Sequence, residues 1–369
     1  MNTSARKKII AECDNIVIKV GTRLLTEPEC IPKLISSIAE LRRRGYRIVL
    51  VSSGAVGIGM KQLGLTKRPS KLSQVQALAA IGQNKLMSIY DDECRKHNFK
   101  SAQLLLTSLD MKERHLNILN CIHALWSDDV LPIVNENDSV SVDELTFGDN
   151  DFLAAMLGTI TRSPLTVILT TESGLRTRNA DGTLGERIST VTAIDATMKA
   201  SASGTDDSHF SIGGMISKLT AAEMVNAAGE YLWVADGRND NTLLDIIDGK
   251  DIGTLFVPSK KRMSGKKRWL SFLTESVGQI MIDDGAVNAV CAKGSSLLPA
   301  GITNVNGSFK RGATVDLCDN KNNILARGLT NFSAEEIAQL QGCQTREIAT
   351  ILKHDCDNEI IHRDNLVVI

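Results

Sequence analysis

Aromatic residues are scarce in this sequence, making up 4% of its 369 residues. Proteins that hold single-stranded nucleic acid stack its bases on several aromatic side chains, so this scarcity disfavours such a surface. The net charge does not indicate a class of binding partner either, because the 42 Lys and Arg residues nearly balance the 43 Asp and Glu residues, for a formal net charge of -1. A local basic patch is neither required nor excluded by that sum.

Long hydrophobic runs are missing. No stretch approaches the roughly 18 uncharged apolar residues expected of a membrane span, and the segment before Lys19 is basic but lacks the apolar core of a signal peptide. The eight cysteines include no C-x-x-C pair, and no His stands at zinc-finger spacing. We therefore expect a cytoplasmic protein, not bound to a membrane, whose cysteines are free thiols.

Two glycine-rich nucleotide motifs are also absent. The chain contains no G-x-x-x-x-G-K-[ST] loop and no G-x-G-x-x-G at the start of a helix. These absences disfavour a P-loop fold and a dinucleotide-binding fold. A nucleotide site in this chain would have to be built from other residues.

What the sequence does contain is an alternation of short β-branched runs and longer helical stretches. This pattern predicts an α/β fold, a three-layer sandwich with a mostly parallel sheet. Ligands of such sheets collect at the carboxyl ends of the strands. The short runs are 16–20, 47–51, 131–134, 165–169 and 231–235, and the helical stretches are 31–44, 73–95 and 150–160.

The last third of the chain follows a different pattern. A polar, basic segment at 259–268 has the composition of a linker. Residues 269–331 form short runs punctuated by glycine, which are typical of a small β-barrel or sandwich. Ser333 and Glu336 have the spacing of a capping box, so a helix is predicted from Ser333 to near Gly342. The predicted domains are residues 1–260, a linker at 261–276 and a mainly-β domain at 277–369.

Small and polar residues follow the first two predicted strands. Lys19 and Gly21 end the first strand, and Ser53 and Gly54 follow the second. Glycine lets the backbone approach an anion, while lysine and serine supply charge and donors. Each feature taken alone is also explained by an ordinary strand-end turn, with a solvated lysine or a serine that caps a helix.

Amides and carboxylates are dense after the run 131–134, in NEND (135–138) and GDND (148–151). So many acids in one loop repel one another unless cations or donors balance them. The alternatives are a polar turn, or a helix start capped by Asp149 or Asp151.

Gly213, Gly214 and Lys218 open a further predicted helix. Backbone N–H groups at a helix start, together with an ammonium group, form an anion site. Two lysines, two glycine turns and an acidic amide loop together predict a site that binds a polyphosphate beside an acidic substrate.

Seven runs occur in a fixed order: IVIKVGTRLLT, VLVSSGAVGIG, LAAIGQNKL, LLLT, PIVNENDSV, FGDND and GGMISKLTAA. In that order they resemble the glutamate 5-kinase family of the amino acid kinase superfamily. The segment from Lys267 through DDGAVNAVCAKGSSLLPAGI is similar to the C-terminal PUA domain of that family. The resemblance implies an amino acid kinase fold, followed by a small mainly-β PUA-like barrel.

The resemblance also implies an activity, which is transfer of a phosphoryl group from ATP to the γ-carboxylate of L-glutamate. The product would be L-glutamyl 5-phosphate, the first intermediate of proline biosynthesis, and Mg²⁺ would be held mainly through the phosphates. A homo-oligomer, feedback inhibition by proline and RNA binding through the PUA-like domain are further implications.

Residue roles are implied in the same way. Lys19 and Lys218 would contact the phosphates, with Asp151 between them holding both lysines in place. The positions matching the glutamate-binding residues are Ser53, Asn135, Asp138 and Asn150. The positions matching the ATP-binding residues are Lys19, Gly21, Thr170, Thr171, Ile212, Gly213, Gly214, Met215, Ile216, Ser217 and Lys218.

Three positions depart from the family pattern, all on the nucleotide side. Thr171 stands where the family has an Asp, Arg176 where it has a Tyr, and Ile212 where it has a small or hydroxyl residue. These departures predict altered recognition of the nucleotide, whereas the glutamate-side residues are intact.

Other functions remain open at this point. Aspartate, acetylglutamate and nucleoside monophosphate kinases share the same fold and lysines, so the fold alone does not choose the substrate. An RNA-binding protein acting through the PUA-like part, and a regulatory protein that binds nucleotide without catalysis, are the alternatives from other classes.

Overall fold

The computed structural model describes residues 3–27, 29–140, 150–179, 183–195, 197–199, 214–258, 276–353 and 357–368. Contacts divide the chain into two compact units, residues 1–262 and 263–369. Each unit is described by itself below. The predicted linker at 261–276 lies outside the described residues, except for Ser276.

An eight-stranded sheet forms the centre of the N-terminal unit, in the order β3-β4-β2-β1-β5-β9-β10-β8. Every pair of neighbours is parallel except β9 and β10, which are antiparallel. The predicted mostly parallel sheet is confirmed. The strands are β1 (Asn15–Val20), β2 (Arg47–Val51), β3 (Lys100–Leu106), β4 (Val130–Glu136), β5 (Leu165–Thr170), β8 (Thr190–Val191), β9 (Tyr231–Asp236) and β10 (Thr254–Phe256), with β6 (Arg176–Arg178) and β7 (Leu184–Arg187) forming a separate hairpin.

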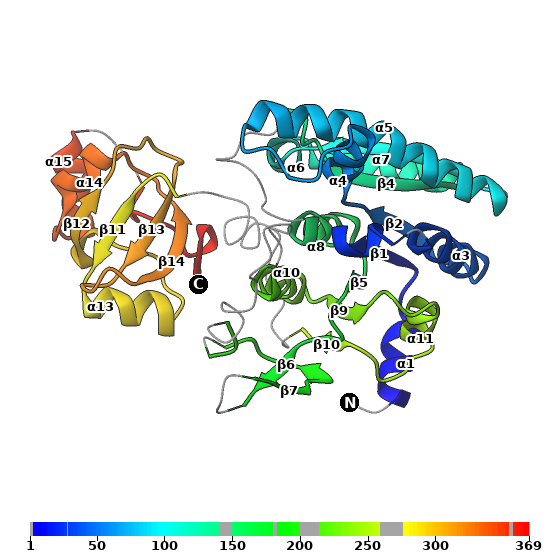
Figure 1. Cartoon of the computed structure of the whole chain (residues 1–369). Helices are drawn as coiled ribbons and strands as arrows, with labels where there is room; N and C mark the ends of the chain where they lie inside the picture. The colour runs from blue at the N-terminus through cyan, green and yellow to red at the C-terminus, as the bar shows by residue number, and fades with distance from the viewer. Residues whose placement is uncertain are drawn as a thin grey trace. The chain divides into compact units, whose positions relative to one another are not determined.

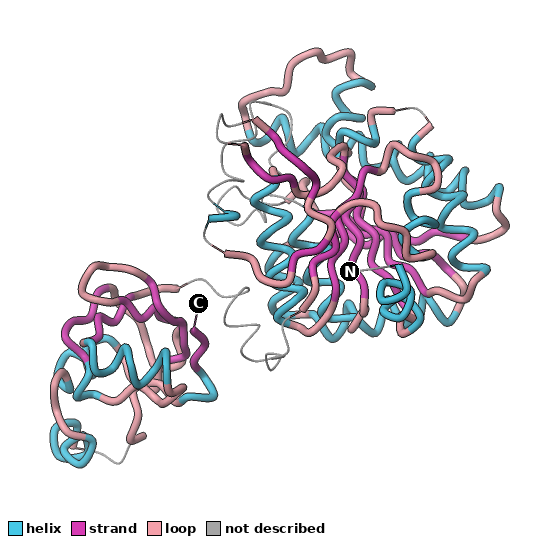
Figure 2. The backbone as a smooth tube through the Cα atoms, turned by 90° about the horizontal axis from the view of Figure 1, so that it is seen from below, coloured by secondary structure: helices cyan, strands magenta, loops and turns pink. Residues whose placement is uncertain are grey.

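Helices cover both faces of this sheet, which gives the predicted three layers (Figures 1 and 2). In Figure 1, α8 and α10 lie on one side of the central strands, and α3 and α11 lie on the other. The helices are α1 (Thr3–Ala11), α2 (Thr22–Leu25), α3 (Cys30–Arg43), α4 (Ala55–Gln62), α5 (Leu72–Lys96), α6 (Ser108–Glu113), α7 (His115–Ser127), α8 (Asn150–Thr161), α10 (Met215–Ala227) and α11 (Thr242–Ile247).

The central strand β1 is buried along its whole length. A strand covered on both faces is expected to be apolar throughout, because neither face meets water. Ile16 and Ile18 share a core with Ile35 of α3 and Ile246 of α11. Since alternate residues of a strand face opposite sides, Lys19 faces the other layer, which is formed by α8 and α10.

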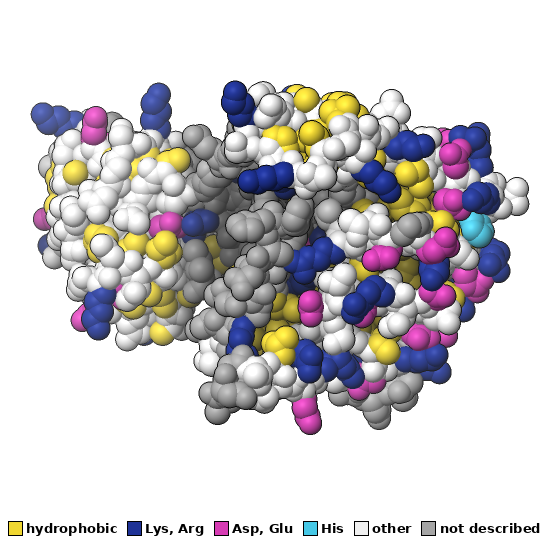
Figure 3. Space-filling model, in the orientation of Figure 1, with side chains coloured by type: hydrophobic (Ala, Val, Ile, Leu, Met, Phe, Trp, Pro, Cys, Tyr) yellow, Lys and Arg dark blue, Asp and Glu magenta, His cyan; other side chains and the backbone are white. Residues whose placement is uncertain are grey.

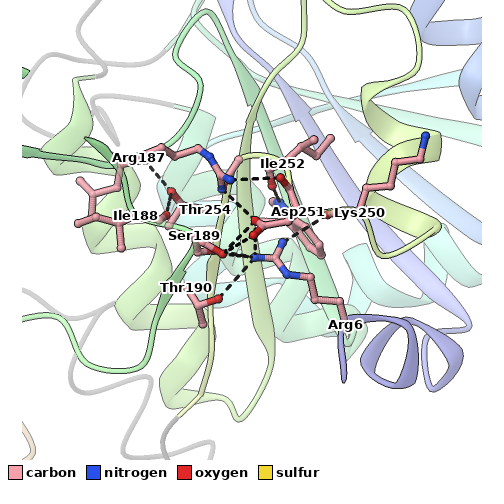
Figure 4. A network of polar contacts seen from close by, with 12 residues as sticks. Arg6, Arg187, Ile188, Ser189, Thr190, Lys250, Asp251, Ile252 and Thr254 are labelled. Carbon is pink, nitrogen blue, oxygen red and sulfur yellow. Dashed lines mark hydrogen bonds and ion pairs between the residues drawn. The ribbon is translucent and has the colours of Figure 1, made fainter. Parts of the chain in front are cut away.

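The N-terminal helix α1 is fastened to the far edge of the sheet by Arg6, which is fully buried. Its guanidinium donates to the carbonyl of Ser189 at 2.9 Å and to Oδ1 of Asp251 at 2.9 Å (Figure 4). The same group lies 4.8 Å from the ring centroid of Trp233 in β9. These contacts place Arg6 in the framework of the sheet.

The C-terminal unit contains a five-stranded sheet in the order β12-β11-β13-β14-β15. Its core includes Ile280, Leu317, Phe332 and Ile337, so the predicted small mainly-β domain is confirmed. Its strands are β11 (Gln279–Ile282), β12 (Ile302–Asn306), β13 (Thr314–Cys318), β14 (Ile324–Leu329) and β15 (Leu366–Val368), and its α-helices are α13 (Asp284–Val287), α14 (Ala334–Leu340) and α15 (Ile348–Leu352).

The capping box predicted at Ser333 is present. The Ser333 hydroxyl accepts from the backbone N–H of Glu336 at 3.3 Å, and the Glu336 carboxylate accepts from the backbone N–H of Ser333 at 2.7 Å. Both bonds satisfy N–H groups at a helix start that have no partner within the helix. The helix begins at Ala334 and ends at Leu340, slightly shorter than predicted.

Surface chemistry of the described residues agrees with the sequence. Lys and Arg side chains intermingle with Asp and Glu over the face of the N-terminal unit shown in Figure 3. The seven cysteines in the described segments are free thiols. Within those segments, no helix has the length and apolar character needed to cross a membrane.

Candidate active site

Two lysines and one aspartate meet between the sheet and its α8–α10 layer. Nζ of Lys19 lies 2.6 Å from Oδ1 of Asp151, and Nζ of Lys218 lies 3.0 Å from Oδ2 of the same carboxylate. Asp151 is 0% exposed, Lys19 is 3% exposed and Lys218 is 5% exposed. The structure therefore brings together the three residues for which a shared role was predicted.

Each of these side chains comes from a different element. Lys19 extends from β1, Asp151 stands in the first turn of α8, and Lys218 stands in the first turn of α10. An aspartate is favourable at the start of a helix because it faces the positive end of the helix dipole. Two ammonium groups around one carboxylate leave a local charge of about +1, which suits an anionic ligand.

Backbone groups near the lysines are suited to the same ligand. Gly214 caps α10 without a side-chain hydrogen bond, and N–H groups at the start of a helix have no partner within the helix. Met215 and Ile216 form the first turn, with Ile216 40% exposed. The Ser217 hydroxyl lies 3.0 Å from Asp151 Oδ2 and 2.8 Å from the Gly214 carbonyl. Ile212 and Gly213 lie outside the described residues.

A second polar cluster lies at the ends of β2 and β4. Nδ2 of Asn150, the first residue of α8, donates to Oγ of Ser53 at 2.8 Å, to the Ser52 carbonyl at 2.8 Å and to Oδ1 of Asn135 at 2.9 Å. Ser53 is 6% exposed and Asn135 is 1% exposed. Three of the four predicted glutamate-side residues are thus joined by hydrogen bonds.

Asp138, the fourth of these residues, lies just beyond β4. It lines a cavity of about 770 Å³ together with Ala55, Gln83 and Asn137. Burial raises the pKa of the Asp138 carboxyl above its ordinary value, while the positive charge of Arg68 opposes the rise. A carboxylate that is partly removed from water in this way gains from pairing with a cation.

The turn from β2 into α4 depends on glycine. Gly54 has φ 90° and ψ 2°, a left-handed conformation that side-chain-bearing residues rarely adopt. This conformation ends the strand directly after Ser53 and starts α4 at Ala55.

Strand order explains how the two clusters are arranged. Ser53 follows β2 and Asn135 belongs to β4, on one side of β1, whereas Thr170 ends β5 on the other side. Lys19 therefore lies on the strand between the two halves. Gly21, which follows β1, donates its N–H to the Leu169 carbonyl at 3.1 Å, which keeps the ends of β1 and β5 together.

Asp236 and Arg238 were not predicted from the sequence. Asp236 pairs with Thr170 across β5 and β9. Arg238 donates to Thr171 O at 2.8 Å and contacts both oxygens of the Asp236 carboxylate. A carboxylate is thus present at this edge of the sheet although residue 171 is Thr. The rule that ligand-binding residues follow strand ends, applied to the run 231–235, would have found both residues.

Gln83 was missed as well. It is 8% exposed on α5, and its Oε1 accepts from Nδ2 of Asn135 at 2.8 Å. Ala79, Leu86 and Tyr90 are buried on the same helix, so Gln83 is a polar residue in an apolar stripe. A polar residue at such a position is the signal that could have identified it.

Comparison with known proteins identifies the family of each unit. The family model described as amino acid kinase family matches residues 14–236, and the one described as PUA domain matches residues 278–352. One solved structure, carbamate kinase from Giardia lamblia bound to AMP-PNP, is 19% identical with a TM-score of 0.48, covering 68% of this chain and 100% of that chain.

Curated relatives match the whole length of the chain. Glutamate 5-kinase from Syntrophus aciditrophicus (strain SB) is 40% identical, with 99% of this chain and 96% of that protein covered. Glutamate 5-kinase from Microcystis aeruginosa is also 40% identical, with 96% of each covered. With identity at this level over nearly its full length, the chain belongs to the glutamate 5-kinase family.

Proposed function

We propose that this protein transfers the γ-phosphoryl group of ATP to the γ-carboxylate of L-glutamate, giving L-glutamyl 5-phosphate and ADP as the first step of proline biosynthesis. The observation that carries the proposal is the buried group of Lys19, Asp151 and Lys218. On one side of it lies the hydrogen-bonded cluster of Asn135 and Asn150, and on the other lies the start of α10, which is suited to phosphates. The activity named for relatives of 40% identity supports it.

The acceptor half fits an amino acid. A free ammonium group would pair with Asp138, whose carboxyl is partly removed from water, and with Oδ1 of Asn150, which is buried and has no hydrogen-bond partner among the described residues. The Ser53 hydroxyl accepts from Asn150, so its own proton can be donated to a substrate carboxylate.

The attacking group needs no general base. A γ-carboxylate has an ordinary pKa of about 4.3, so it is already ionised near neutral pH. The main obstacle is repulsion between the carboxylate and the phosphates. Lys19 and Lys218 offset this repulsion and stabilise the charge on the transferring group, which is the main form of catalysis in phosphoryl transfer.

Asp151 has a positioning role in this proposal. Its two oxygens contact the two lysines, so it fixes the ammonium groups and reduces their mutual repulsion in the absence of substrate. With both oxygens engaged by lysines, the carboxylate is poorly suited to accept a proton from the substrate.

Mg²⁺ is proposed to enter with the nucleotide. No cluster of three His, Cys, Asp or Glu side chains that could hold a metal ion occurs in the described part of the chain. Proteins commonly hold Mg²⁺ beside a nucleotide through one or two carboxylates together with the phosphates. The ion would neutralise charge on the β- and γ-phosphates.

The nucleotide contacts are proposed from the resemblance to the family. Thr170 and Thr171 at the end of β5, Gly21 and the segment from Ile212 to Lys218 are the proposed ATP-binding positions. Inhibition by proline, a homo-oligomer, RNA binding by the C-terminal unit, a cytoplasmic location and domain limits at 260 and 277 remain predictions from the sequence.

A coupled ADP-release assay with glutamate, aspartate and acetylglutamate tests the function, with hydroxylamine added to trap an acyl phosphate as a hydroxamate. We expect turnover with glutamate alone, and a loss of at least about 100-fold in Lys218→Ala, since a charge contact to the transferring group is removed. Lys61→Ala, which removes an exposed lysine at the end of α4, is the control and should retain full activity.

Two results would contradict the proposal. Unchanged turnover in Lys218→Ala would show that the site is misassigned. Hydroxamate formation with aspartate or acetylglutamate in preference to glutamate would show that the substrate is wrong.

A further inference from the structure

Gln83 is a buried amide that the proposed function does not use. It lies on α5, 8% exposed, in the stripe that also buries Ala79 and Leu86. Removing a side-chain amide from water is unfavourable unless its groups find partners. The partner of Gln83 Oε1 is Nδ2 of Asn135, at 2.8 Å.

Asn135 continues this chain of amides toward the acceptor half. It is 1% exposed, and its Oδ1 accepts from Nδ2 of Asn150 at 2.9 Å and from the backbone N–H of Glu136 at 2.9 Å. Reversing the amide would place its N–H groups against these two donors and its oxygen against Gln83 Oε1. The Gln83 acceptor and the Glu136 backbone N–H therefore both favour this orientation of Asn135.

That orientation fixes Asn150 in turn. Its Nδ2 lies among three acceptors, which are Asn135 Oδ1, Ser53 Oγ and the Ser52 carbonyl. With the nitrogen held there, Oδ1 is turned away from this cluster. Oδ1 is buried without a hydrogen-bond partner among the residues that the structure describes, so it is available to accept from a ligand.

We propose that Gln83 is a positioning residue for the phosphoryl acceptor, acting through Asn135 on Asn150 and Ser53. The inference deepens the proposed function and rests on it. It also gives Asn135 an indirect role, since both ends of its amide already face protein groups.

The effect of Gln83 should be specific to glutamate. The hydrogen bonds from Gln83 through Asn135 to Asn150 form a relay. It ends in the half of the site on the β2 and β4 side of Lys19, whereas Thr170 and Thr171 lie on the β5 side. Without the Gln83 carbonyl, the buried Nδ2 of Asn135 loses its hydrogen-bond partner, so Asn135 and, through it, Asn150 are held less firmly in place. A lost buried hydrogen bond of this kind corresponds to a change of about tenfold in affinity.

The test uses the full chain with Gln83→Met, which keeps the length of the side chain and removes the acceptor. We expect the KM for glutamate to rise about tenfold and the KM for ATP to stay within about twofold. Gln74→Met is the matched control, because it makes the same change at an exposed position of α5 and should leave both KM values unchanged. Gln83→Ala provides a second variant if the first does not fold.

A double-mutant cycle separates positioning from simple packing. Asn150→Ala removes the end of the relay, so adding Gln83→Met to it should leave the KM for glutamate within about twofold of the single Asn150→Ala variant. A packing defect would instead multiply the two effects and would raise the KM for ATP as well.

The outcomes are distinguishable from those of the proposed function. If the wild-type protein forms hydroxamate from glutamate but Gln83→Met has an unchanged KM for glutamate, or if the effects multiply in the cycle, the positioning role is wrong and the kinase function stands. If the wild-type protein shows no glutamate turnover, both fall together.

Discussion

Asp151 makes two buried lysines compatible with each other. Ammonium groups at 2.6 and 3.0 Å from its two oxygens would repel one another strongly without the carboxylate, because the site excludes water and screening is weak. With it, the three side chains together carry a charge of about +1 at the place where the phosphates are proposed to bind. In the proposed mechanism the same residue thereby supports both the folded state and the binding of an anion.

Asp138 should give the reaction an acid limb in its pH profile. Burial raises the pKa of its carboxyl, with Arg68 opposing, so protonation begins at a higher pH than for an ordinary aspartate at about 3.9. Because the ionised form is the one proposed to bind the substrate ammonium, kcat/KM for glutamate should fall as the pH decreases through this raised pKa. The measurement is kcat/KM followed from pH 8 downward, through the ordinary titration range of an aspartate.

Asp138→Asn is the companion variant. It should lower kcat/KM for glutamate by roughly 10- to 100-fold, the effect of losing a hydrogen bond to a charged partner, and it should lack the acid limb. A limb that persists in the variant would assign the titration to another group.

The helices α4 and α5 touch at their backbones, and this contact supports the acceptor half. A Cβ atom built on Gly82 would lie 1.8 Å from the Ala55 carbonyl oxygen and 2.5 Å from the Gly59 nitrogen. Only glycine allows such an approach. Ala55 begins α4 immediately after Ser53 and Gly54, and Gly82 precedes Gln83 on α5. The contact between α4 and α5 therefore sets the distance between Ser53 and Gln83.

Gly82→Ala should therefore destabilise the protein by about 2 kcal/mol or more through overpacking, and it should raise the KM for glutamate by moving α4. Gly57→Ala is the matched control on α4, because a Cβ there meets nothing within 4 Å. It should stabilise the helix by up to about 1 kcal/mol. Urea unfolding of both variants measures the difference, and equal stabilities would contradict the proposed contact.

The sequence predicted the elements that carry strong local signals. The buried runs at 16–20, 47–51 and 165–169 became β1, β2 and β5 because they are rich in β-branched residues. Strand β3 was missed, since KSAQLLL contains no β-branched residue, and β8 and β10 are too short to show a period. These strands depend on pairing with neighbours more than on local preference.

The candidate site likewise contains features that local sequence signals predict and features that depend on the tertiary fold. Residues at strand ends, such as Lys19 and Ser53, were found because the position itself marks them. The contacts among the site residues were not predicted, because the hydrogen bond between Asn150 and Ser53 joins residues 97 positions apart and depends on the strand order. Gln83, which lies within a helix and not at a strand end, was missed for the same reason.

The whole chain is organised as two units with separate cores. The core around β1 draws on residues from Ile9 to Val257, and the core of the C-terminal unit draws on residues from Ile280 to Leu366. The two family models also fall one in each unit, at 14–236 and 278–352. The predicted break at 259–268 lies outside the described residues.

Truncation after Pro258 tests whether this separation extends to function. Every described residue of the candidate site, from Lys19 to Arg238, lies in the N-terminal unit, and the described core around β1 reaches from Ile9 to Val257. A unit with its own core can fold alone, so the truncated chain should unfold cooperatively and should turn over glutamate with a kcat within about threefold of the full chain. A truncated chain with native circular dichroism but no turnover would mean that the C-terminal unit contributes to catalysis, and the kinase site would then have to be sought in both units.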